Sequence, residues 1–189
     1  MFNPEAYQLG AQRSCIRELF EYGRSRAAVV GAENVLDYSL GNPSIPSPKA
    51  VDDTIRAVLM DTPTLLVHGY TSAAGDLTAR KAIADDLNER YEAGVKPENL
   101  FIGCGAAPEL AAVIRALQIP GGEFLAIAPY FPEYKVFVEA AGGVFRVVPP
   151  DVPNFQIKLD AVEAMLTEHT QAIIINSPNN PSGVVYTKE

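Results

Sequence analysis

Residues 122–148 read GEFLAIAPYFPEYKVFVEAAGGVFRVV, and this stretch decides the fold class. Its run 124–128 is apolar at every position, which predicts a strand buried on both faces. Residues 132–141 predict a helix, and 144–148 predict a second strand. Strands that are apolar on both faces and separated by helices are typical of a parallel sheet covered by helices.

The same alternation continues on both sides of this stretch. Toward the carboxyl end, a helix is expected over 159–167 and an apolar strand over 172–175. Toward the amino end, residues 110–117 have the i, i+3, i+4, i+7 spacing of a buried helix face, after a short strand at 100–103. The sequence therefore predicts an α/β fold with a mainly parallel sheet covered by helices.

The first 76 residues add helices and one strand. Pro48 suits the first turn of a helix, and Asp76 is typical of the residue that caps the start of another. Residues 34–40 (NVLDYSL) have the composition of a short strand, whereas residues 1–33 predict a helical lead-in. The GNPSIPSP segment after residue 40 has three prolines and a glycine, which predict a loop.

Composition excludes several classes of protein. Apolar residues make up 48% of the 189 residues and charged residues 20%, so the chain can build a core. A net charge of −8 without a basic block argues against a nucleic-acid partner. The apolar runs are too short to span a membrane, and the amino terminus does not resemble a secretory signal. With only two cysteines, we expect no disulfide framework and a cytoplasmic location.

Ligands of open parallel sheets bind at the carboxyl ends of strands, so the loops there are candidate sites. The turn at 103–107 (GCGAA) precedes a helix whose free N–H groups suit a phosphate, although a plain strand–helix turn has the same composition. A dinucleotide fingerprint fails because Pro108 occupies the third glycine position and Pro129 the acidic position. This leaves a phosphate site or an empty turn.

Two further loops suit a flat ligand. Residues 129–134 (PYFPEY) place three aromatic rings at a strand end, where they either join the core or stack on a ligand ring. Residues 177–183 (SPNNPSG) have turn composition, but two asparagines follow an apolar strand and offer neutral amide donors.

Five segments, in order and approximate spacing, resemble the pyridoxal-phosphate-dependent aminotransferases of the aspartate aminotransferase fold (class I/II, fold type I), over the N-terminal half. They are GNP at 41–43, HGYTSAAG at 68–75, GCGAAPEL at 103–110, PYFPEY at 129–134 and SPNNPSG at 177–183. The resemblance implies transamination between an amino acid and a 2-oxo acid, with pyridoxal 5'-phosphate as cofactor, in a homodimer. A C–S lyase or synthase of the same fold is an alternative, as is a non-catalytic remnant or binding module.

The resemblance also assigns roles to residues of the first three segments. Gly41 matches the glycine where the substrate carboxylate docks. Tyr70 matches a tyrosine that reaches the cofactor phosphate of the partner subunit. Gly105, Ala106 and Ala107 match the turn whose backbone N–H groups bind the phosphate; because both side chains are alanines, the grip would come from the backbone alone.

The last two segments would bind the cofactor ring. Phe131 matches the aromatic residue that stacks on the pyridine ring, and Tyr134 lines the same wall. Asn180 matches the asparagine that donates to the phenolic oxygen of the cofactor. Family members also turn sharply at two prolines, so we expect cis peptide bonds before Pro129 and Pro181.

The resemblance implies further parts beyond residue 189. The family's Schiff-base lysine, its aspartate to the pyridinium nitrogen and its substrate-binding arginine all follow the SPNNPSG segment, so we assign no catalytic residue here. Residues 1–47 are expected to be the helical lead-in and substrate loop, and 48–189 the first part of the cofactor-binding large domain. The rest of that domain and a small C-terminal domain would be absent, and the strands near Phe124 and Ile174 would lack neighbours and promote self-association.

Overall fold

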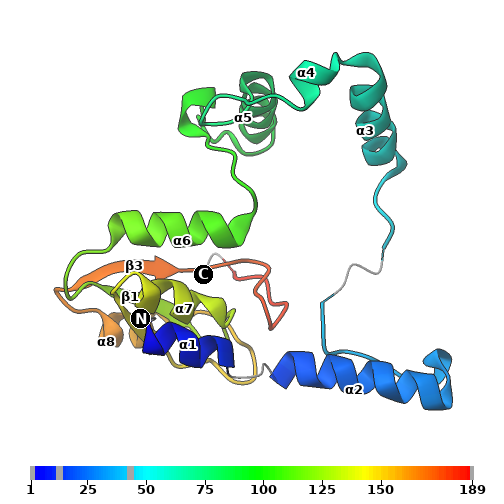
Figure 1. Cartoon of the computed structure of the whole chain (residues 1–189). Helices are drawn as coiled ribbons and strands as arrows, with labels where there is room; N and C mark the ends of the chain where they lie inside the picture. Colours follow the sequence, from blue (N-terminus) through cyan, green and yellow to red (C-terminus); the bar gives the residue numbers. More distant parts are fainter. Residues whose placement is uncertain (1–2, 12–14, 42–44, 188–189) are drawn as a thin grey trace. The chain divides into compact units, whose positions relative to one another are not determined.

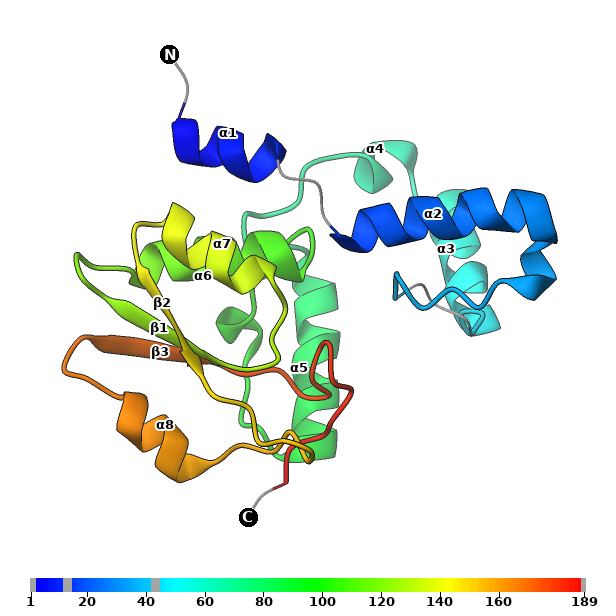
Figure 2. The same ribbon diagram turned by 90° about the horizontal axis from the view of Figure 1, so that it is seen from below.

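The computed structural model describes residues 3–11, 15–41 and 45–187. It divides into two compact units, Met1–Gly69 and Tyr70–Glu189. Figures 1 and 2 show the helices of the first unit in blue to cyan and the sheet of the second in yellow-green to orange.

The regular elements described in the first unit are all helices. Its elements are α1 (Pro4–Ala11), α2 (Cys15–Val30), the 3₁₀ helix η1 (Ala32–Asn34), α3 (Lys49–Asp61) and α4 (Thr64–Val67). Helix α3 begins directly after Pro48, as predicted, and α1 and α2 lie within residues 1–33, where helices were predicted. Neither α2 nor α3 contains a buried residue.

The prediction of a strand at residues 34–40 is wrong. Residues 35–40 form no strand, and Asn34 ends the 3₁₀ helix, with its side chain donating to the Val30 carbonyl oxygen at 2.7 Å. Asp37 instead accepts from the backbone N–H of Ser39 at 2.9 Å and from its hydroxyl, which is a local turn. Strand composition is not sufficient where the backbone bonds within its own turn.

The second unit contains a three-stranded parallel sheet. Its elements, in chain order, are α5 (Leu77–Tyr91), the 3₁₀ helix η2 (Pro97–Asn99), α6 (Ala106–Leu117), β1 (Glu123–Ile127), α7 (Glu133–Ala140), β2 (Val144–Val148), α8 (Leu159–Met165) and β3 (Thr170–Ile174). The strand order is β2-β1-β3, and both pairings are parallel. The predicted α/β fold class is therefore confirmed. The predicted cap is also confirmed, because the Asp76 side chain accepts from the N–H of Ala79 at 2.9 Å.

Successive residues of β1 point to opposite faces of the sheet and belong to two separate cores. Phe124 packs with Ile114 of α6 and Val138 of α7 on one face. On the other face, Leu125 packs in a cluster that includes Val162 of α8. Because every residue from Phe124 to Ile127 is buried, the apolar run that predicted this strand is explained by helices on both sides.

Two further expectations are corrected by the sheet. Residues 100–103 form no strand; the backbone N–H of Ile102 donates to the carbonyl of Ala74, in the loop before α5, and that of Leu100 donates to the carbonyl of Pro97 in η2. The strand around Phe124 does not lack neighbours, since β1 pairs on both sides. The chain returns twice to the same strand, which the apolar pattern alone does not reveal.

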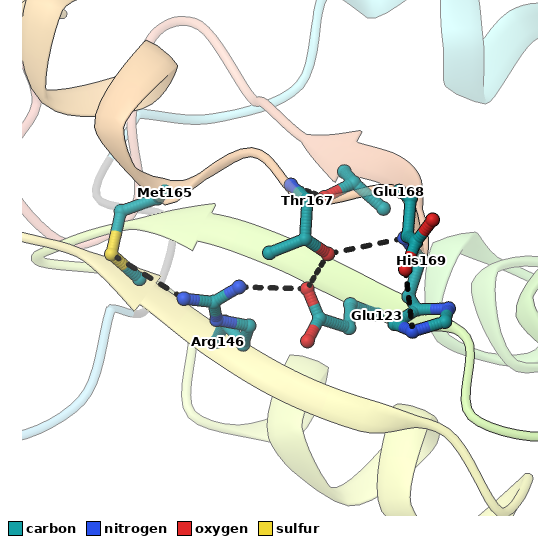
Figure 3. Close-up of polar contacts among 7 residues, drawn as sticks. Glu123, Arg146, Met165, Thr167, Glu168 and His169 are labelled. Atoms are coloured by element: carbon teal, nitrogen blue, oxygen red, sulfur yellow. Dashed lines mark hydrogen bonds and ion pairs between the residues drawn. The ribbon is translucent and has the colours of Figure 1, made fainter.

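A group of hydrogen-bonded polar side chains, here called the polar tie, joins the strands near their amino-terminal ends (Figure 3). The carboxylate of Glu123 accepts from Nη1 of Arg146 at 2.7 Å and from the hydroxyl of Thr167, also at 2.7 Å. These hydrogen bonds, the Arg146 bond first, lower the pKa of Glu123 below its ordinary value. The polar tie connects β1, β2 and the α8–β3 turn. It lies at the opposite end of the strands from the loops that carry the candidate site.

Candidate functional site

The carboxyl ends of β1 and β3 lie side by side because the two strands are parallel neighbours. Residues 128–134 follow β1, and residues 175–183 follow β3. The residues predicted to contact a cofactor ring are therefore at adjacent strand ends of one sheet. This is the edge where open parallel sheets bind ligands.

The predicted phosphate turn is at the start of α6. Gly105 caps the helix with φ +124°, a conformation that glycine adopts without strain. Ala106 and Ala107 are the first helical residues, and N–H groups at this end of a helix have no partner within it. The turn is exposed, so these groups and the positive end of the helix dipole are available to an anion.

The same turn also contains an acidic side chain that the sequence analysis did not consider. A Cβ atom at position 103 would overlap the carboxyl group of Glu109, so this carboxylate lies directly against Gly103. Glu109 belongs to the first turn of α6, where a negative charge is favourable to the helix dipole. Gly103 thus leaves room for Glu109.

The aromatic residues after β1 form a packed group. The rings of Phe131 and Tyr134 meet edge to face with centroids 5.6 Å apart, and Phe131 is half-buried whereas Tyr134 is buried. Tyr130 meets Phe145 of β2 in the same way at 5.0 Å. Burial raises the pKa of Tyr134 above its ordinary value, and the nearby Tyr186 raises it further. Tyr134 therefore stays neutral at physiological pH.

The SPNNPSG loop has two asparagines in opposite environments. Asn180 is exposed, whereas the Asn179 side chain is buried, with 6% of the residue's surface accessible. The sequence offered both asparagines as amide donors, but the Asn179 amide is already bonded to Tyr186, and its contacts with Ser182 and Tyr186 are not specified by composition. The predicted cis bonds at Ala128-Pro129 and Asn180-Pro181 are both present.

The segment that contains Tyr70 is anchored at its far end. Arg80 of α5 donates from Nε to the carbonyl of Gly75 at 3.3 Å and from Nη1 to that of Pro97 at 2.8 Å. Gly75 has φ +93° and packs so closely on Ile102 that a Cβ atom would lie 2.8 Å from that side chain. Tyr70 itself is fully exposed.

Gly41, the predicted substrate-loop glycine, is exposed and belongs to the first unit. The two residues that complete the GNP segment, 42 and 43, lie outside the described residues.

No group of three or more His, Cys, Asp or Glu that could hold a metal occurs among residues 3–11, 15–41 and 45–187. Cys15 and Cys104 are both exposed free thiols. None of the described helices is long and apolar enough to cross a membrane.

Comparison with known proteins identifies the class of protein that this sheet and these loops define. The family model for aminotransferases of class I and II matches residues 32–189. The chain belongs to the class I and II aminotransferase family.

Similar proteins fall in the same family. The chain is 33% identical over 171 residues to an aspartate aminotransferase from Thermotoga maritima, covering 88% of this chain and 43% of that protein. A solved amino transferase structure from Eubacterium rectale is 53% identical, with TM-score 0.95, covering 100% of this chain and 48% of that one. An aspartate aminotransferase from Thermus thermophilus solved with maleate has TM-score 0.83 at 26% identity, with the same coverage. The chain spans less than half the length of these relatives.

Proposed function

We propose that the protein to which this chain belongs transfers an amino group between an amino acid and a 2-oxo acid, using pyridoxal 5'-phosphate. The observation that supports this most strongly is the pairing of β1 with β3, because it brings the Phe131 loop and the Asn180 loop to adjacent strand ends. Relatives are named for different donors, including a glutamate-pyruvate aminotransferase from Escherichia coli at 32% identity, so the proposal names no donor.

The residues present fit this cofactor chemically. The exposed start of α6 offers the N–H groups of Gly105, Ala106 and Ala107 to a phosphate. Phe131 presents a half-buried ring for stacking on a pyridine, supported edge-on by Tyr134. Asn180 has an exposed amide that can donate to a phenolic oxygen.

When bound, pyridoxal 5'-phosphate would act as an electron sink for the bonds at the substrate Cα atom. This chain's own residues would hold and tune it. The Asn180 amide would donate to the phenolic oxygen and favour its ionised form, which keeps the pKa of that oxygen low. Phe131 would shield one ring face from water, and the neutral Tyr134 would support Phe131 without adding a charge.

The proposal extends to groups beyond this sheet edge. Gly41 would receive the substrate carboxylate, and Tyr70, which is fully exposed here, would donate to the cofactor phosphate held by a partner subunit of a homodimer. Residues 1–47 would form the lead-in and substrate loop, and 48–189 the first part of the large domain. We place the reaction in the cytoplasm.

We also infer that these 189 residues do not complete the reaction alone. Among the described lysines, Lys49, Lys135 and Lys158 form ion pairs with Asp53, Glu139 and Asp151. Lys81 lies within α5 and Lys96 caps η2, while Lys188 is outside the described residues. When pyridoxal 5'-phosphate is added to the 189-residue chain, we expect no lysine-bound cofactor. Such a species would appear as a visible absorption band that survives gel filtration and disappears when one of the lysines is replaced. Such a band would overturn this inference.

The activity is tested on the full natural polypeptide with ¹⁵N-labelled amino acids and unlabelled 2-oxo acids. Transamination predicts ¹⁵N in a new amino acid, and this transfer should fall strongly in Asn180→Ala. Release of the label as ammonium with no labelled amino acid would identify a lyase instead. No turnover across the common amino acids in a protein that binds the cofactor would contradict the proposal.

A further inference from the structure

The buried Asn179 side chain connects both arms of the SPNNPSG loop. Its Oδ1 atom accepts from the backbone N–H of Ser182 at 3.1 Å and from the hydroxyl of Ser182 at 2.8 Å. Its backbone N–H donates to the carbonyl of Val184 at 2.8 Å, and its carbonyl accepts from the N–H of Gly183 at 2.7 Å. The loop is therefore closed around Asn179, on both sides of Asn180.

The amide nitrogen of Asn179 binds a residue outside the loop. Its Nδ2 donates to the phenolic oxygen of Tyr186 at 3.0 Å, and it also approaches Oδ1 of Asn176 at 3.4 Å. A buried amide that uses both its donor and its acceptor fixes its own orientation, and leaving either unpaired would cost free energy. Among the residues whose burial the structure describes, Asn179 is the one buried side chain that is an amide or carries a charge.

Tyr186 is in turn fixed by its own backbone and neighbours. Its N–H donates to the hydroxyl of Ser177 at 3.2 Å. Gln156, from the loop between β2 and α8, accepts from the N–H of Thr187 at 3.2 Å and donates to the carbonyl of Val185 at 3.3 Å. The Tyr186 segment is thus tied on both sides to the β2–α8 loop, which makes it a firm support for Asn179.

The same tyrosine also lies close to the aromatic group after β1. Tyr186 contributes to the raised pKa of Tyr134, whose ring packs on Phe131.

We propose that Asn179, supported by Tyr186, is a positioning residue that holds the neighbouring Asn180 amide in place for the cofactor. This rests on the proposed function, because Asn180 needs a ligand to donate to. Asn179 itself faces Ser182 and Tyr186, so it acts through the backbone of the loop and not by contact with the ligand.

The first test needs no cofactor. Hydrogen exchange of the Ser182 amide, whose acceptor is Asn179 Oδ1, is measured in the wild type and in Asn179→Ala. Exchange should accelerate by about 10-fold in Asn179→Ala, because the acceptor is lost and the loop opens. Asn180→Ala should leave this exchange unchanged, as should Asn154→Ala, an exposed asparagine of the β2–α8 loop. Unchanged exchange in Asn179→Ala would overturn the proposal.

The second test uses the full natural polypeptide with pyridoxal 5'-phosphate. The readout is the pH midpoint of the change in the cofactor's visible absorption. Asn180→Ala should raise the midpoint by about one unit, because the ionised phenolic oxygen loses a donor. Asn179→Ala should raise it in the same direction by less, and Tyr186→Phe, which removes the acceptor of the Asn179 amide, by less again.

The two tests separate the two proposals. If the Ser182 amide exchanges faster in Asn179→Ala but the wild type does not bind the cofactor, the hydrogen bond from Ser182 to Asn179 is confirmed and the proposed function is refuted. Normal cofactor spectra in Asn179→Ala, together with a shifted midpoint in Asn180→Ala, would show that Asn179 only stabilises the fold, and the positioning role would be wrong.

Discussion

The two units of the chain treat their apolar side chains differently. The second unit buries ten hydrophobic residues, including two clusters on opposite faces of its sheet. In the described part of the first unit, α2 and α3 bury none, and the apolar residues of α3, such as Ile55 and Leu59, are exposed. Amphipathic helices depend mainly on packing for their stability. The strand-end site is therefore supported by a core within its own unit, whereas the helices of the first unit require another surface on which to pack.

The largest expected effect tests this difference directly. Leu125→Ala removes a fully buried side chain from the core and should lower the free energy of unfolding by about 2–5 kcal/mol. Leu65→Ala, at an 88% exposed position in the first unit, should change it by less than about 0.5 kcal/mol. Urea denaturation at pH 7 measures both. Comparable losses would show that Leu65 is covered in solution and that the contrast between the units does not hold.

A second prediction concerns the exposed tyrosine at the start of the second unit. In the full natural polypeptide, Tyr70→Phe should weaken pyridoxal 5'-phosphate binding by about 1.5–3 kcal/mol, the worth of one hydrogen bond to a charged group. Tyr38→Phe, at a position 90% exposed in the first unit, is the matched control and should leave the affinity unchanged. Cofactor affinity is measured by equilibrium dialysis. An unchanged affinity in Tyr70→Phe would mean that its hydroxyl does not reach the phosphate.

A third prediction asks which exposed apolar face promotes self-association of the 189-residue chain. Ile55 of α3 and Val113 of α6 are both 53% exposed, but α6 also buries Ile114 whereas α3 buries nothing. Ile55→Lys should therefore reduce the mass measured by light scattering more than Val113→Lys does. Equal reductions would assign the association to the surface of the second unit as well. A wild-type chain that is already monomeric would contradict the premise.

The smallest effect concerns pH and is confined to the second unit. Because Arg146 and Thr167 lower the pKa of Glu123 in the folded state, its ionised form stabilises the fold above the ordinary value of 4.5. This contribution is lost as the pH falls through the lowered pKa. Thermal unfolding of Glu123→Gln should therefore depend less on pH in this acidic range than wild type. Glu163→Gln, at an exposed position of α8, should keep the wild-type dependence; equal slopes in wild type and Glu123→Gln would refute the role of this tie.

The sequence predicted what depends on short-range patterns. The uninterrupted apolar run at 124–128 predicted β1 because burial on both faces removes every polar position. Asp76 predicted a helix start because its side chain accepts from a backbone N–H three residues later. The same reasoning failed for residues 34–40 and 100–103, because a strand also needs a partner strand, which composition does not specify.

At the candidate site, sequence motifs located the loops but not their internal support. Resemblance pointed to Phe131 and Asn180, and the parallel pairing of β1 with β3 explains why these two loops are adjacent. The supporting role of Asn179 was missed because its hydrogen bonds depend on how the chain turns back toward Tyr186. The signal that was present is the asparagine itself, which is common in turns because its side chain bonds nearby backbone groups.

The central place of β1 has a consequence for synthesis on the ribosome. Of the three strands, β1 is synthesised first. In the folded sheet it lies between β2 and β3, which both follow it in the chain. About 50 residues separate Phe124 from Ile174, a delay of about 3–10 s at translation rates of about 5–20 residues per second. Both hydrogen-bonding edges of the buried strand β1 are open until β2 is made, and the edge that pairs with β3 stays open throughout this interval. Chaperones that shield short apolar segments would therefore have most effect on this protein between the emergence of β1 and that of β3.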